Sequence, residues 1–389
     1  MPACLRLEKR MRIIKLLMAV LLLTTLLACS SAKDVNIDSY GDSDYDTDYY
    51  EESEKEERIV VGFSQIGAES DWRSSNTRSM KNQFTESEGY ELIFEDAQQK
   101  QTNQIMAIRS FIQQEVDYIV LAPVTETGWD TVLAEAKEAE IPVIVVDRMV
   151  DVEDDDLFTC WVGSDFELEA KKVCEWLHQF TRKNNIKPED IHIADIQGTY
   201  GASAQIGRSK GLRDAAAEHG WDIVATVDGD FTQTKGREVT EKLLERYKNL
   251  NVIYCENDNE AFGAIEAVNA SGRRVGSDIM NGEIMILSFD GVKPEALQDV
   301  VNDSISCIGE CNPLHGPRVA AIIETLEQGG TPEKFEYVDE KIYSANEDIV
   351  SVTTNMNNYE VTYVTKAMVE DRKRQADYSN YTDLSHNVY

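Results

Sequence analysis

Short apolar runs alternate with longer amphipathic stretches along most of the chain. From residue 59 onward, β-branched runs predict strands at 59–64, 91–95, 118–122, 143–146, 160–163, 191–196, 223–227, 252–255, 284–289 and 305–308. Helical spacing of apolar residues predicts helices at 74–88, 101–114, 130–139, 166–182, 203–218, 235–248, 259–270, 294–302 and 316–327. Near-continuous apolar strands that alternate with helices are typical of parallel sheets covered on both faces.

The number of strands indicates two lobes. About ten strands exceed what one doubly wound sheet comfortably holds, and 389 residues suffice for two cores. We therefore predict an α/β chain with two Rossmann-like lobes. The stretch 150–158, with three consecutive aspartates, is the candidate for the first crossing between them.

The first residues have the pattern of an export signal. Basic residues (Arg10, Arg12 and Lys15) precede an uncharged apolar run at 16–28. Thirteen residues at ~1.5 Å each fall short of a ~30 Å bilayer core. Leu26-Leu27-Ala28-Cys29 resembles a bacterial lipobox. We expect residues 1–28 to be a signal peptide and Cys29 to be lipidated. A plain cleaved signal and a retained anchor are the alternatives, and Met11 is an alternative start.

An acidic segment follows Cys29. Residues 34–57 contain eleven Asp and Glu and one Lys, with no periodic apolar face. Like charges repel, which predicts a solvated, flexible tether over 29–57. Calcium binding is the sharper alternative, but the turn glycine and terminal Glu of a calcium loop are missing.

Composition narrows the class of partner and of site. The formal charge of −33 argues against nucleic acid and anionic lipid, which both require Lys and Arg. Five histidines, none paired at ligand spacing, disfavour a zinc site, so we expect no metal. Without Cys4 and Cys29, five cysteines remain, an odd set that we expect to be mostly buried small hydrophobes rather than a disulfide framework.

Polar and aromatic residues follow many of the predicted strands. Open α/β sheets bind ligands at the carboxyl ends of their strands. The ends here carry Glu69-Ser70-Asp71-Trp72-Arg73, Asp147-Arg148, Gln197-Gly198, Asp230-Phe231, Asn257-Asp258 and Asp290-Gly291. No phosphate-binding glycine motif follows the first strand, which disfavours a nucleotide enzyme. Carboxylates, guanidinium groups and amides match a polyhydroxyl ligand, and aromatic faces match the C–H side of a sugar ring.

Each of these residues also has a structural interpretation. Asp147 and Arg148 could form a surface turn with its own ion pair, and Asp290 could cap a helix. Trp72 and Phe231 could be packing residues, and Arg208 could lie on a solvated helix face. The coincidence of compatible chemistry at five or six strand ends favours a ligand site.

Linked motifs give the chain a resemblance to a known family. They are Val61-Gly62-Phe63-Ser64-Gln65, Glu69-x-x-Trp72-Arg73, Asp96-Ala97-Gln98-Gln99-Lys100-Gln101, Ala122-Pro123 with Gly128-Trp129, Ile141-Pro142-Val143, Gln197-Gly198-Thr199 and Gly229-Asp230-Phe231-Thr232. Over roughly 59–340 they resemble the sugar-binding periplasmic proteins of the ribose/galactose type, and most closely the galactofuranose-binding members that serve ABC importers.

The resemblance implies a type 1 periplasmic-binding-protein fold, with two lobes joined by a three-crossing hinge. It implies a sugar-binding domain over 58–345, with lobe 1 at 58–155 and 311–340 and lobe 2 at 156–310 and 341–352. The remaining 353–389 would be a C-terminal extension, partly disordered. The implied ligand-binding residues are Glu69, Ser70, Asp71, Trp72, Arg73, Asp147, Arg148, Arg208, Asn257 and Asp290, with Phe231 and Glu310 as further candidates.

The expected protein is a monomeric solute receptor without cofactor or catalytic residues. It would be lipid-anchored to the outer face of the cytoplasmic membrane and would deliver a galactofuranose-like hexose to an ABC permease. Glu256 and Asp71 depart from the family pattern and leave the identity of the monosaccharide open. A sensor role, with a histidine kinase or chemoreceptor as partner, is the alternative. A glycosidase using Asp147 and Asp290 is disfavoured because Arg148 keeps the neighbouring carboxylate ionised. A repressor is excluded by the export signal and the missing DNA-binding helices.

Overall fold

The computed structural model describes residues 58–377. The expected signal peptide, Cys29, the acidic tether and residues 378–389 lie outside the described residues. Residues 58–320 and 333–377 belong to one compact unit, which contains both sheets and the site below. Residues 321–332, the later part of one helix and the turn after it, belong to a separate unit. Of the helices in the described part, none has the length and apolar character needed to cross a membrane.

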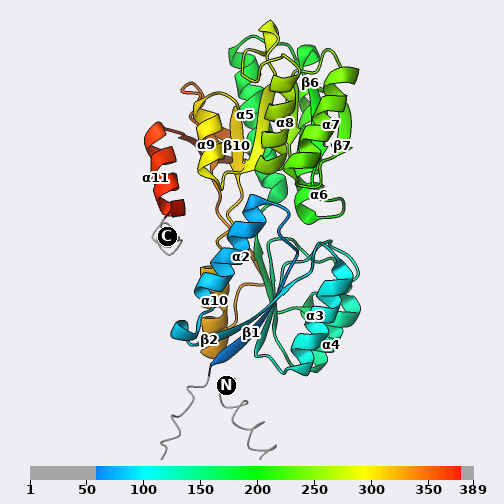
Figure 1. The fold of residues 1–389 in the computed structure, drawn as a ribbon, viewed down its shortest axis with the longest axis vertical. Helices are drawn as coiled ribbons and strands as arrows, with labels where there is room; N and C mark the ends of the chain where they lie inside the picture. Colours follow the sequence, from blue (N-terminus) through cyan, green and yellow to red (C-terminus); the bar gives the residue numbers. More distant parts are fainter. Residues whose placement is uncertain (1–57, 378–389) are drawn as a thin grey trace, which may run out of the picture. The chain divides into compact units, whose positions relative to one another are not determined.

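The strands form two sheets, one in each lobe (Figure 1). The strands are β1 (Ile59–Gln65), β2 (Tyr90–Asp96), β3 (Tyr118–Leu121), β4 (Val143–Val146), β5 (Cys160–Gly163), β6 (His192–Gln197), β7 (Asp222–Asp228), β8 (Val252–Cys255), β9 (Met285–Asp290), β10 (Cys307–Glu310), β11 (Phe335–Tyr337), β12 (Ile342–Ser344), β13 (Ser351–Thr354) and β14 (Asn357–Tyr363). The first sheet has the order β11-β5-β4-β3-β1-β2 and is parallel throughout. The second has the order β13-β14-β12-β10-β9-β8-β6-β7, with antiparallel pairs only at β10–β12 and β13–β14.

Helices cover the sheets. They are α2 (Asp71–Gln83), α3 (Gln101–Gln113), α4 (Asp130–Glu138), α5 (Phe166–Lys183), α6 (Ser203–His219), α7 (Gln233–Arg246), α8 (Asp258–Ala270), α9 (Pro294–Val301), α10 (His315–Glu327) and α11 (Lys366–Asp377). In the first lobe, α3 and α4 lie on one side of the sheet and α2 on the other (Figure 1). The ten predicted strands and nine predicted helices are all present, with ends shifted by a few residues, and the predicted fold class is confirmed.

The strands of the second lobe are apolar on both faces because each face is covered. Val252 and Tyr254 of β8 pack in one core cluster with residues of α5 and α6. The alternate residues Ile253 and Cys255 pack in another with residues of α7 and α8. Successive strand side chains point to opposite faces, so one short run supplies both cores. The five described cysteines are all buried and unbonded, as the sequence predicts.

Three segments connect the lobes, at 164–165, 311–314 and 338–341. The expected first crossing at 150–158 is wrong, because β5 pairs with β4 and β11 and so belongs to the first sheet. The acidic run at 154–156 lies in an exposed loop with a short 3₁₀ turn between β4 and β5. These three aspartates are therefore solvated loop residues and do not form a hinge between the lobes.

The chain beyond residue 350 takes part in the fold. β14 pairs with β12 and adds a strand to the second sheet, and β13 pairs with β14. Val369 of α11 is fully buried in the core that also contains residues of α9. Lobe 2 therefore extends beyond the expected boundary at residue 352.

Candidate functional site

The carboxyl ends of β1, β4 and β9 and the loop after β7 converge on one cavity. Three of its residues, Asp147, Phe231 and Asp290, have positive φ angles of 64°, 58° and 102°. Residues with side chains rarely adopt this conformation, and it persists only where the surroundings hold it. Backbone strain is thus concentrated at or just after the carboxyl ends of β4, β7 and β9, where the side chains line the cavity.

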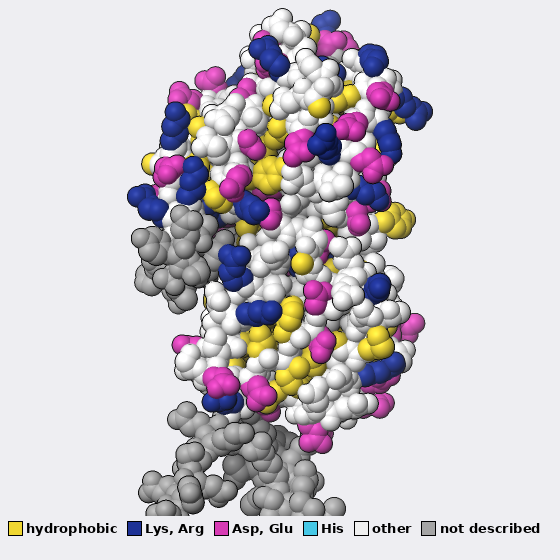
Figure 2. Space-filling view, in the orientation of Figure 1, with side chains coloured by type: hydrophobic (Ala, Val, Ile, Leu, Met, Phe, Trp, Pro, Cys, Tyr) yellow, Lys and Arg dark blue, Asp and Glu magenta, His cyan; other side chains and the backbone are white. Residues whose placement is uncertain are grey.

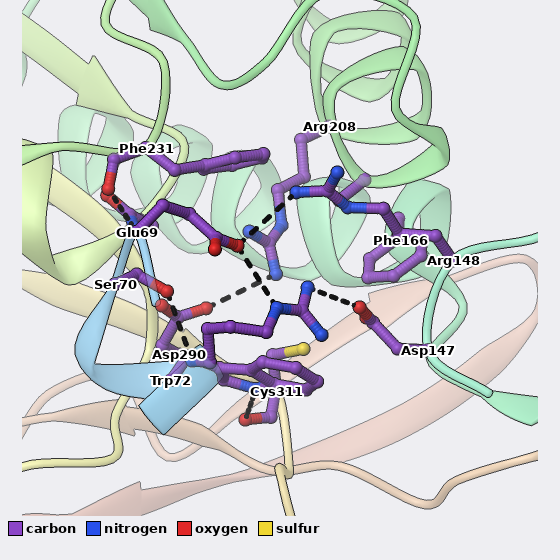
Figure 3. Close-up of a pocket in the computed structure, with 13 residues that line it drawn as sticks. Glu69, Ser70, Trp72, Asp147, Arg148, Phe166, Arg208, Phe231, Asp290 and Cys311 are labelled. Carbon is purple, nitrogen blue, oxygen red and sulfur yellow. Dashed lines mark hydrogen bonds and ion pairs between the residues drawn. The ribbon is translucent and has the colours of Figure 1, made fainter. Parts of the chain in front are cut away.

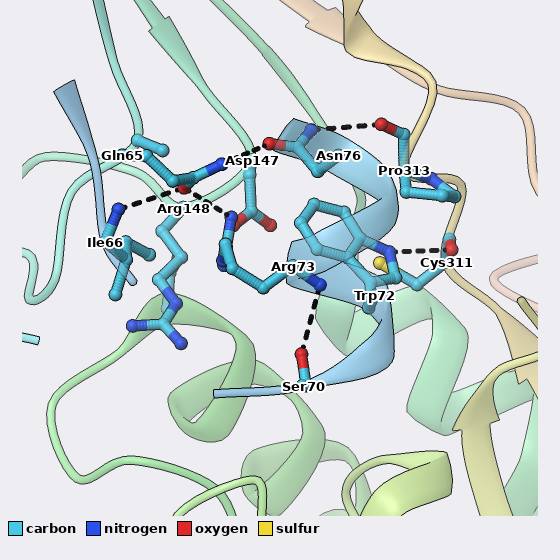
Figure 4. A network of polar contacts seen from close by, with 12 residues as sticks. Gln65, Ile66, Ser70, Trp72, Arg73, Asn76, Asp147, Arg148, Cys311 and Pro313 are labelled. Carbon is cyan, nitrogen blue, oxygen red and sulfur yellow. Dashed lines mark hydrogen bonds and ion pairs between the residues drawn. The ribbon is translucent and has the colours of Figure 1, made fainter. Parts of the chain in front are cut away.

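Helix α2 brings one aromatic residue, Trp72, and one cationic residue, Arg73, to the cavity in its first turn. The Ser70 hydroxyl caps the helix by accepting a hydrogen bond from the Arg73 backbone N–H at 3.1 Å. The helix therefore begins three residues earlier than predicted. Trp72 Nε1 donates to the carbonyl oxygen of Cys311 in the second crossing at 2.8 Å, which fixes the indole against the hinge (Figure 4).

The guanidinium of Arg73 is held by three acceptors. Its Nε donates to Glu69 at 3.0 Å, and its Nη2 donates to Asp147 at 2.6 Å. Its Nη1 donates to Gln65 Oε1 at 3.3 Å, and Gln65 is itself anchored through Asn76 (Figure 4). Burial raises the pKa of Asp147, but Arg73 and other cations outweigh burial and lower it overall. Asp147 therefore stays ionised and fixes the cation beside it.

Arg148 is a buried cation with less compensation. Its Nη1 donates to the Val124 carbonyl at 2.7 Å, and its Nη2 lies 3.8 Å from Glu69 Oε1. Its guanidinium carbon lies 5.3 Å from the centroid of the Phe231 ring on lobe 2. Burial and the neighbouring Arg73 lower the pKa of Arg148 to about 10, so it remains charged at neutral pH.

Arg208 supplies the cation of the second lobe. It lies on α6, is 2% exposed, and donates from Nε to Glu169 at 2.9 Å. Its Nη1 donates to the Glu256 carbonyl, and its Nη2 lies 3.6 Å from Asp290. Arg208 is thus buried and lines the cavity, and it is not part of a solvated helix face.

Aromatic rings form the apolar part of the wall. Trp72 and Phe231 belong to one buried cluster with Phe166 and Cys311. Figure 3 shows the rings of Phe166 and Phe231 beside the guanidinium groups of Arg148 and Arg208. Such an arrangement suits a ligand with both hydroxyl edges and C–H faces.

The cavity leaves hydrogen-bonding capacity unused. Glu69 Oε2 is buried and has no hydrogen-bond partner among the described residues, and Arg208 Nη2, although it lies 2.9 Å from Glu169 Oε2, makes no aligned hydrogen bond there. Unpaired buried polar atoms are costly, so a partner from a ligand would be favoured. The space between these side chains that is not filled by protein atoms is about 300 Å³, open solvent included.

The structure brings together ten of the twelve predicted residues, which are Glu69, Ser70, Trp72, Arg73, Asp147, Arg148, Arg208, Phe231, Asn257 and Asp290. Two lie elsewhere and correct the predicted lining. Asp71 points to lobe 2 at the ion pair with Lys293, at 2.6 Å. Glu310 accepts from the Lys341 backbone N–H and the Tyr343 hydroxyl at the hinge.

Three lining residues are additional to the prediction, namely Phe166, Ala204 and Cys311. Phe166 follows β5 at the start of α5, so the strand-end rule could have identified it. Asn257 uses its side chain locally, because it caps α8 at the Glu260 N–H and donates to the Phe231 carbonyl. Its amide therefore shapes the wall.

The two lobes contact each other around the cavity. Asp71 and Asn259 exchange two hydrogen bonds, and the Met149 N–H donates to the Ser203 hydroxyl at 3.0 Å. On the face drawn in Figure 2, acidic and basic side chains of the described residues are interspersed. This face shows no basic stripe of the kind that follows a phosphate backbone.

Comparison of the chain with known proteins identifies its family. A model described as periplasmic binding protein domain matches residues 61–307. The galactofuranose-binding protein YtfQ of Escherichia coli is 39% identical over 290 residues, 73% of this chain and 87% of that protein. The fructose import binding protein FruE of Bifidobacterium longum is 30% identical, over 77% of this chain and 89% of that protein.

Solved structures agree with the sequence relatives. The periplasmic component of the arabinose ABC transporter of Shewanella sp. ANA-3, bound to L-arabinofuranose, is 35% identical with a TM-score of 0.70, and the match covers 83% of this chain and 98% of that one. A Mycobacterium smegmatis structure in complex with β-D-fucofuranose is 32% identical with a TM-score of 0.71, covering 84% and 98%. The relatives are solute-binding proteins, in agreement with the expectation that the chain is not an enzyme. The chain belongs to the periplasmic binding protein family.

Proposed function

We propose that this protein is an extracytoplasmic receptor that captures one furanose-form monosaccharide, a galactofuranose-like hexose, and delivers it to an ABC importer. The observation that carries the proposal is the set of buried cations paired with carboxylates around one cavity with aromatic walls. Lobe 1 contributes Arg73 and Arg148, and lobe 2 contributes Arg208. Each hydroxyl of a sugar both donates and accepts, which suits such a mixed lining.

The burial of the lining side chains and the fixed guanidinium groups support a monosaccharide over a larger ligand. Arg73 has three acceptors in place before any ligand arrives, so little ordering is needed on binding. The names of YtfQ and of the arabinofuranose and fucofuranose complexes support a five-membered ring. Trp72, Phe166 and Phe231 would contact the C–H faces of that ring.

Closure would couple capture to delivery. A sugar that contacts Glu69 on one lobe and Arg208 on the other stabilises the closed form by its differential affinity for that form. The permease would then recognise the closed lobes. Lipidation at Cys29, after removal of 1–28, would keep the receptor at the outer face of the cytoplasmic membrane, and the segment 29–57 would act as its tether.

Calorimetric titration of the full chain tests the proposal. The panel contains D-galactose and L-arabinose, which include furanose forms at equilibrium, and methyl pyranosides of both, which cannot open to a furanose. A Kd of ~1 μM corresponds to about −8 kcal/mol. The proposal predicts binding of a free sugar and none of its pyranoside. Equal binding of the pyranosides would contradict the furanose assignment, and binding of no sugar would contradict the receptor function.

A further inference from the structure

A group of buried polar side chains lies where the three crossings between the lobes meet. Ser164 comes from the first crossing, Cys311 and Asn312 from the second, and Glu340 from the third. The Ser164 hydroxyl and the Asn312 backbone N–H both donate to Glu340 Oε1, at 2.7 and 2.6 Å. Glu340 therefore ties all three crossings together.

A second carboxyl group faces this junction. One carboxylate oxygen of Glu169, on α5, lies within 4.8 Å of one of Glu340 and of Cys311 Sγ. Glu169 and Glu340 are 2% and 6% exposed, and Glu169 Oε1 has no hydrogen-bond partner among the described residues. Two ionised carboxylates that are buried and close together repel each other, so the arrangement is unfavourable unless one of them holds a proton.

The electrostatic surroundings agree with a shared proton. Burial raises the pKa of both Glu169 and Glu340 above the ordinary carboxyl range. The nearby charge of Glu169 raises the pKa of Glu340 further, whereas the charge of Arg208 lowers that of Glu169. Glu340 is therefore the member that carries the proton, and Glu169 is the carboxylate that accepts from it.

The other charges around the pair disfavour a metal ion in the same place. Arg208 lies 2.9 Å from Glu169 Oε2, and Lys172 Nζ donates to the Glu340 carbonyl at 2.8 Å while lying over the Tyr359 ring. Two cations thus already face the two carboxyl groups. Burial keeps the pKa of the Cys311 thiol well above its usual range, so the sulfur is not an ionised ligand.

The pair is connected to the cavity through one side chain. Arg208 donates from Nε to Glu169 Oε2, and its Nη2 lies 3.6 Å from Asp290, the remaining carboxylate that faces it. Glu169 is therefore one of the groups that hold Arg208, together with the Glu256 carbonyl, and Glu169 in turn faces Glu340.

We propose that Glu169 and Glu340 are positioning residues that share one proton across the closed hinge and thereby hold Arg208 toward the ligand, so that sugar binding takes up a proton. This rests on the proposed function. Opening moves the crossings relative to α5 and hydrates the pair, which releases the proton. Affinity then falls as pH rises above the ordinary carboxyl range, by up to about tenfold per pH unit for one linked proton.

Titration of the full chain with D-galactose and L-arabinose between about pH 5 and about pH 9 tests this proposal. Glu340→Gln keeps the acceptor for Ser164 and Asn312 and supplies a permanent donor to Glu169. We expect it to bind with a nearly pH-independent Kd, whereas the wild type weakens as pH rises. The matched control is Asp339→Asn, which removes an exposed charge from the adjacent position and should retain the wild-type profile.

An unchanged pH profile in Glu340→Gln overturns the proposal, because a merely structural role would leave the slope intact. Infrared difference spectra between the sugar-loaded and the ligand-free chain give a second readout. A protonated-carboxyl band that appears on sugar binding in the wild type and not in Glu340→Gln supports the pair, and its absence from a wild type that binds the sugar overturns it. Stoichiometric Co²⁺ binding with a thiolate absorption band would overturn it in favour of a metal site.

Discussion

Asp71 and Asn259 form a reciprocal pair between the lobes. The Asp71 backbone N–H donates to Asn259 Oδ1 at 3.0 Å, and Asn259 Nδ2 donates back to Asp71 Oδ2 at 3.1 Å. Lys293 adds an ion pair to the same aspartate at 2.6 Å. Asp71 thus lies at the first position of α2 as part of a clasp between lobes, outside the lining of the cavity.

Removal of this clasp should weaken ligand binding without changing the cavity. Asn259→Ala loses two hydrogen bonds made between the lobes, which at ~1–2 kcal/mol predicts a Kd about 5- to 30-fold higher. Calorimetry with the sugar that binds the wild type measures this change in Kd. Asn269→Ala, at the exposed far end of the same helix, is the control and should bind normally. An unaltered Kd in Asn259→Ala would show that the clasp contributes nothing to closure.

The planar guanidinium of Arg73, which donates to three acceptors at once, should contribute more to ligand binding than its positive charge alone. Arg73→Lys keeps a cation but cannot reach Glu69, Gln65 and Asp147 together. Loss of one charge-assisted bond, at ~1.5–3 kcal/mol, predicts a Kd about 10- to 150-fold higher. Arg109→Lys, at an exposed ion pair with Glu135, should leave binding unchanged. Normal binding by Arg73→Lys would remove this residue from the proposed site.

Buried carboxyl groups of lobe 2 should make the fold less stable at higher pH. Burial raises the pKa of Asp195 and of Asp258 to about 7. The folded chain therefore retains protons that the unfolded chain releases near pH 4, so the free energy of unfolding decreases as pH rises from about 4 to about 7. We expect a melting temperature several degrees lower at the upper end of that range.

Asp195→Asn provides the test, because it removes one of these titrations. Its melting temperature should vary less with pH than that of the wild type. Asp222→Asn, on the exposed edge strand β7, should reproduce the wild-type profile. A wild-type melting temperature that rises steadily over this pH interval would contradict the assignment of protonated buried carboxyl groups.

The segment beyond residue 350 should be needed for stability. A chain that ends at residue 350 loses β13, β14 and α11, with the buried side chains Val352, Val361 and Val369. Each fully buried valine contributes ~1.5–3 kcal/mol. We expect this chain to melt far below the wild type or to be insoluble. Melting of this chain at the wild-type temperature would mean that residues 351–377 do not stabilise lobe 2.

The sequence predicts the repetitive part of the fold well, because strands such as Val143–Val146 are continuously apolar and their lengths are unambiguous. Prediction from the sequence fails for features that leave no periodic pattern of apolar residues. The first crossing is at 164–165, where Ser164 and Asp165 resemble any strand-to-helix turn, whereas the more conspicuous aspartate run at 154–156 is only solvated. The strands β11 to β14, of which β11 and β13 lie at sheet edges, are short or partly exposed and resemble loops in sequence.

The candidate site was predictable to the extent that strand ends determine position. Asp147 and Asp290 reach the cavity because parallel strands end at one edge. Asp71 lies in the first turn of α2, whereas Glu69 precedes the helix, and this position directs Asp71 to Asn259 and Lys293. Contacts between residues nearly 200 positions apart are not visible in a single sequence. The contribution of Cys311 likewise depends on where the second crossing passes.

A crystal structure of the full chain with the sugar that binds in calorimetry would show the ligand and its ring form. We expect one monosaccharide in the furanose form, in contact with Glu69 from lobe 1 and Arg208 from lobe 2, its ring between Trp72, Phe166 and Phe231. A sugar bound elsewhere, or a pyranose ring in this cavity, would contradict this expectation.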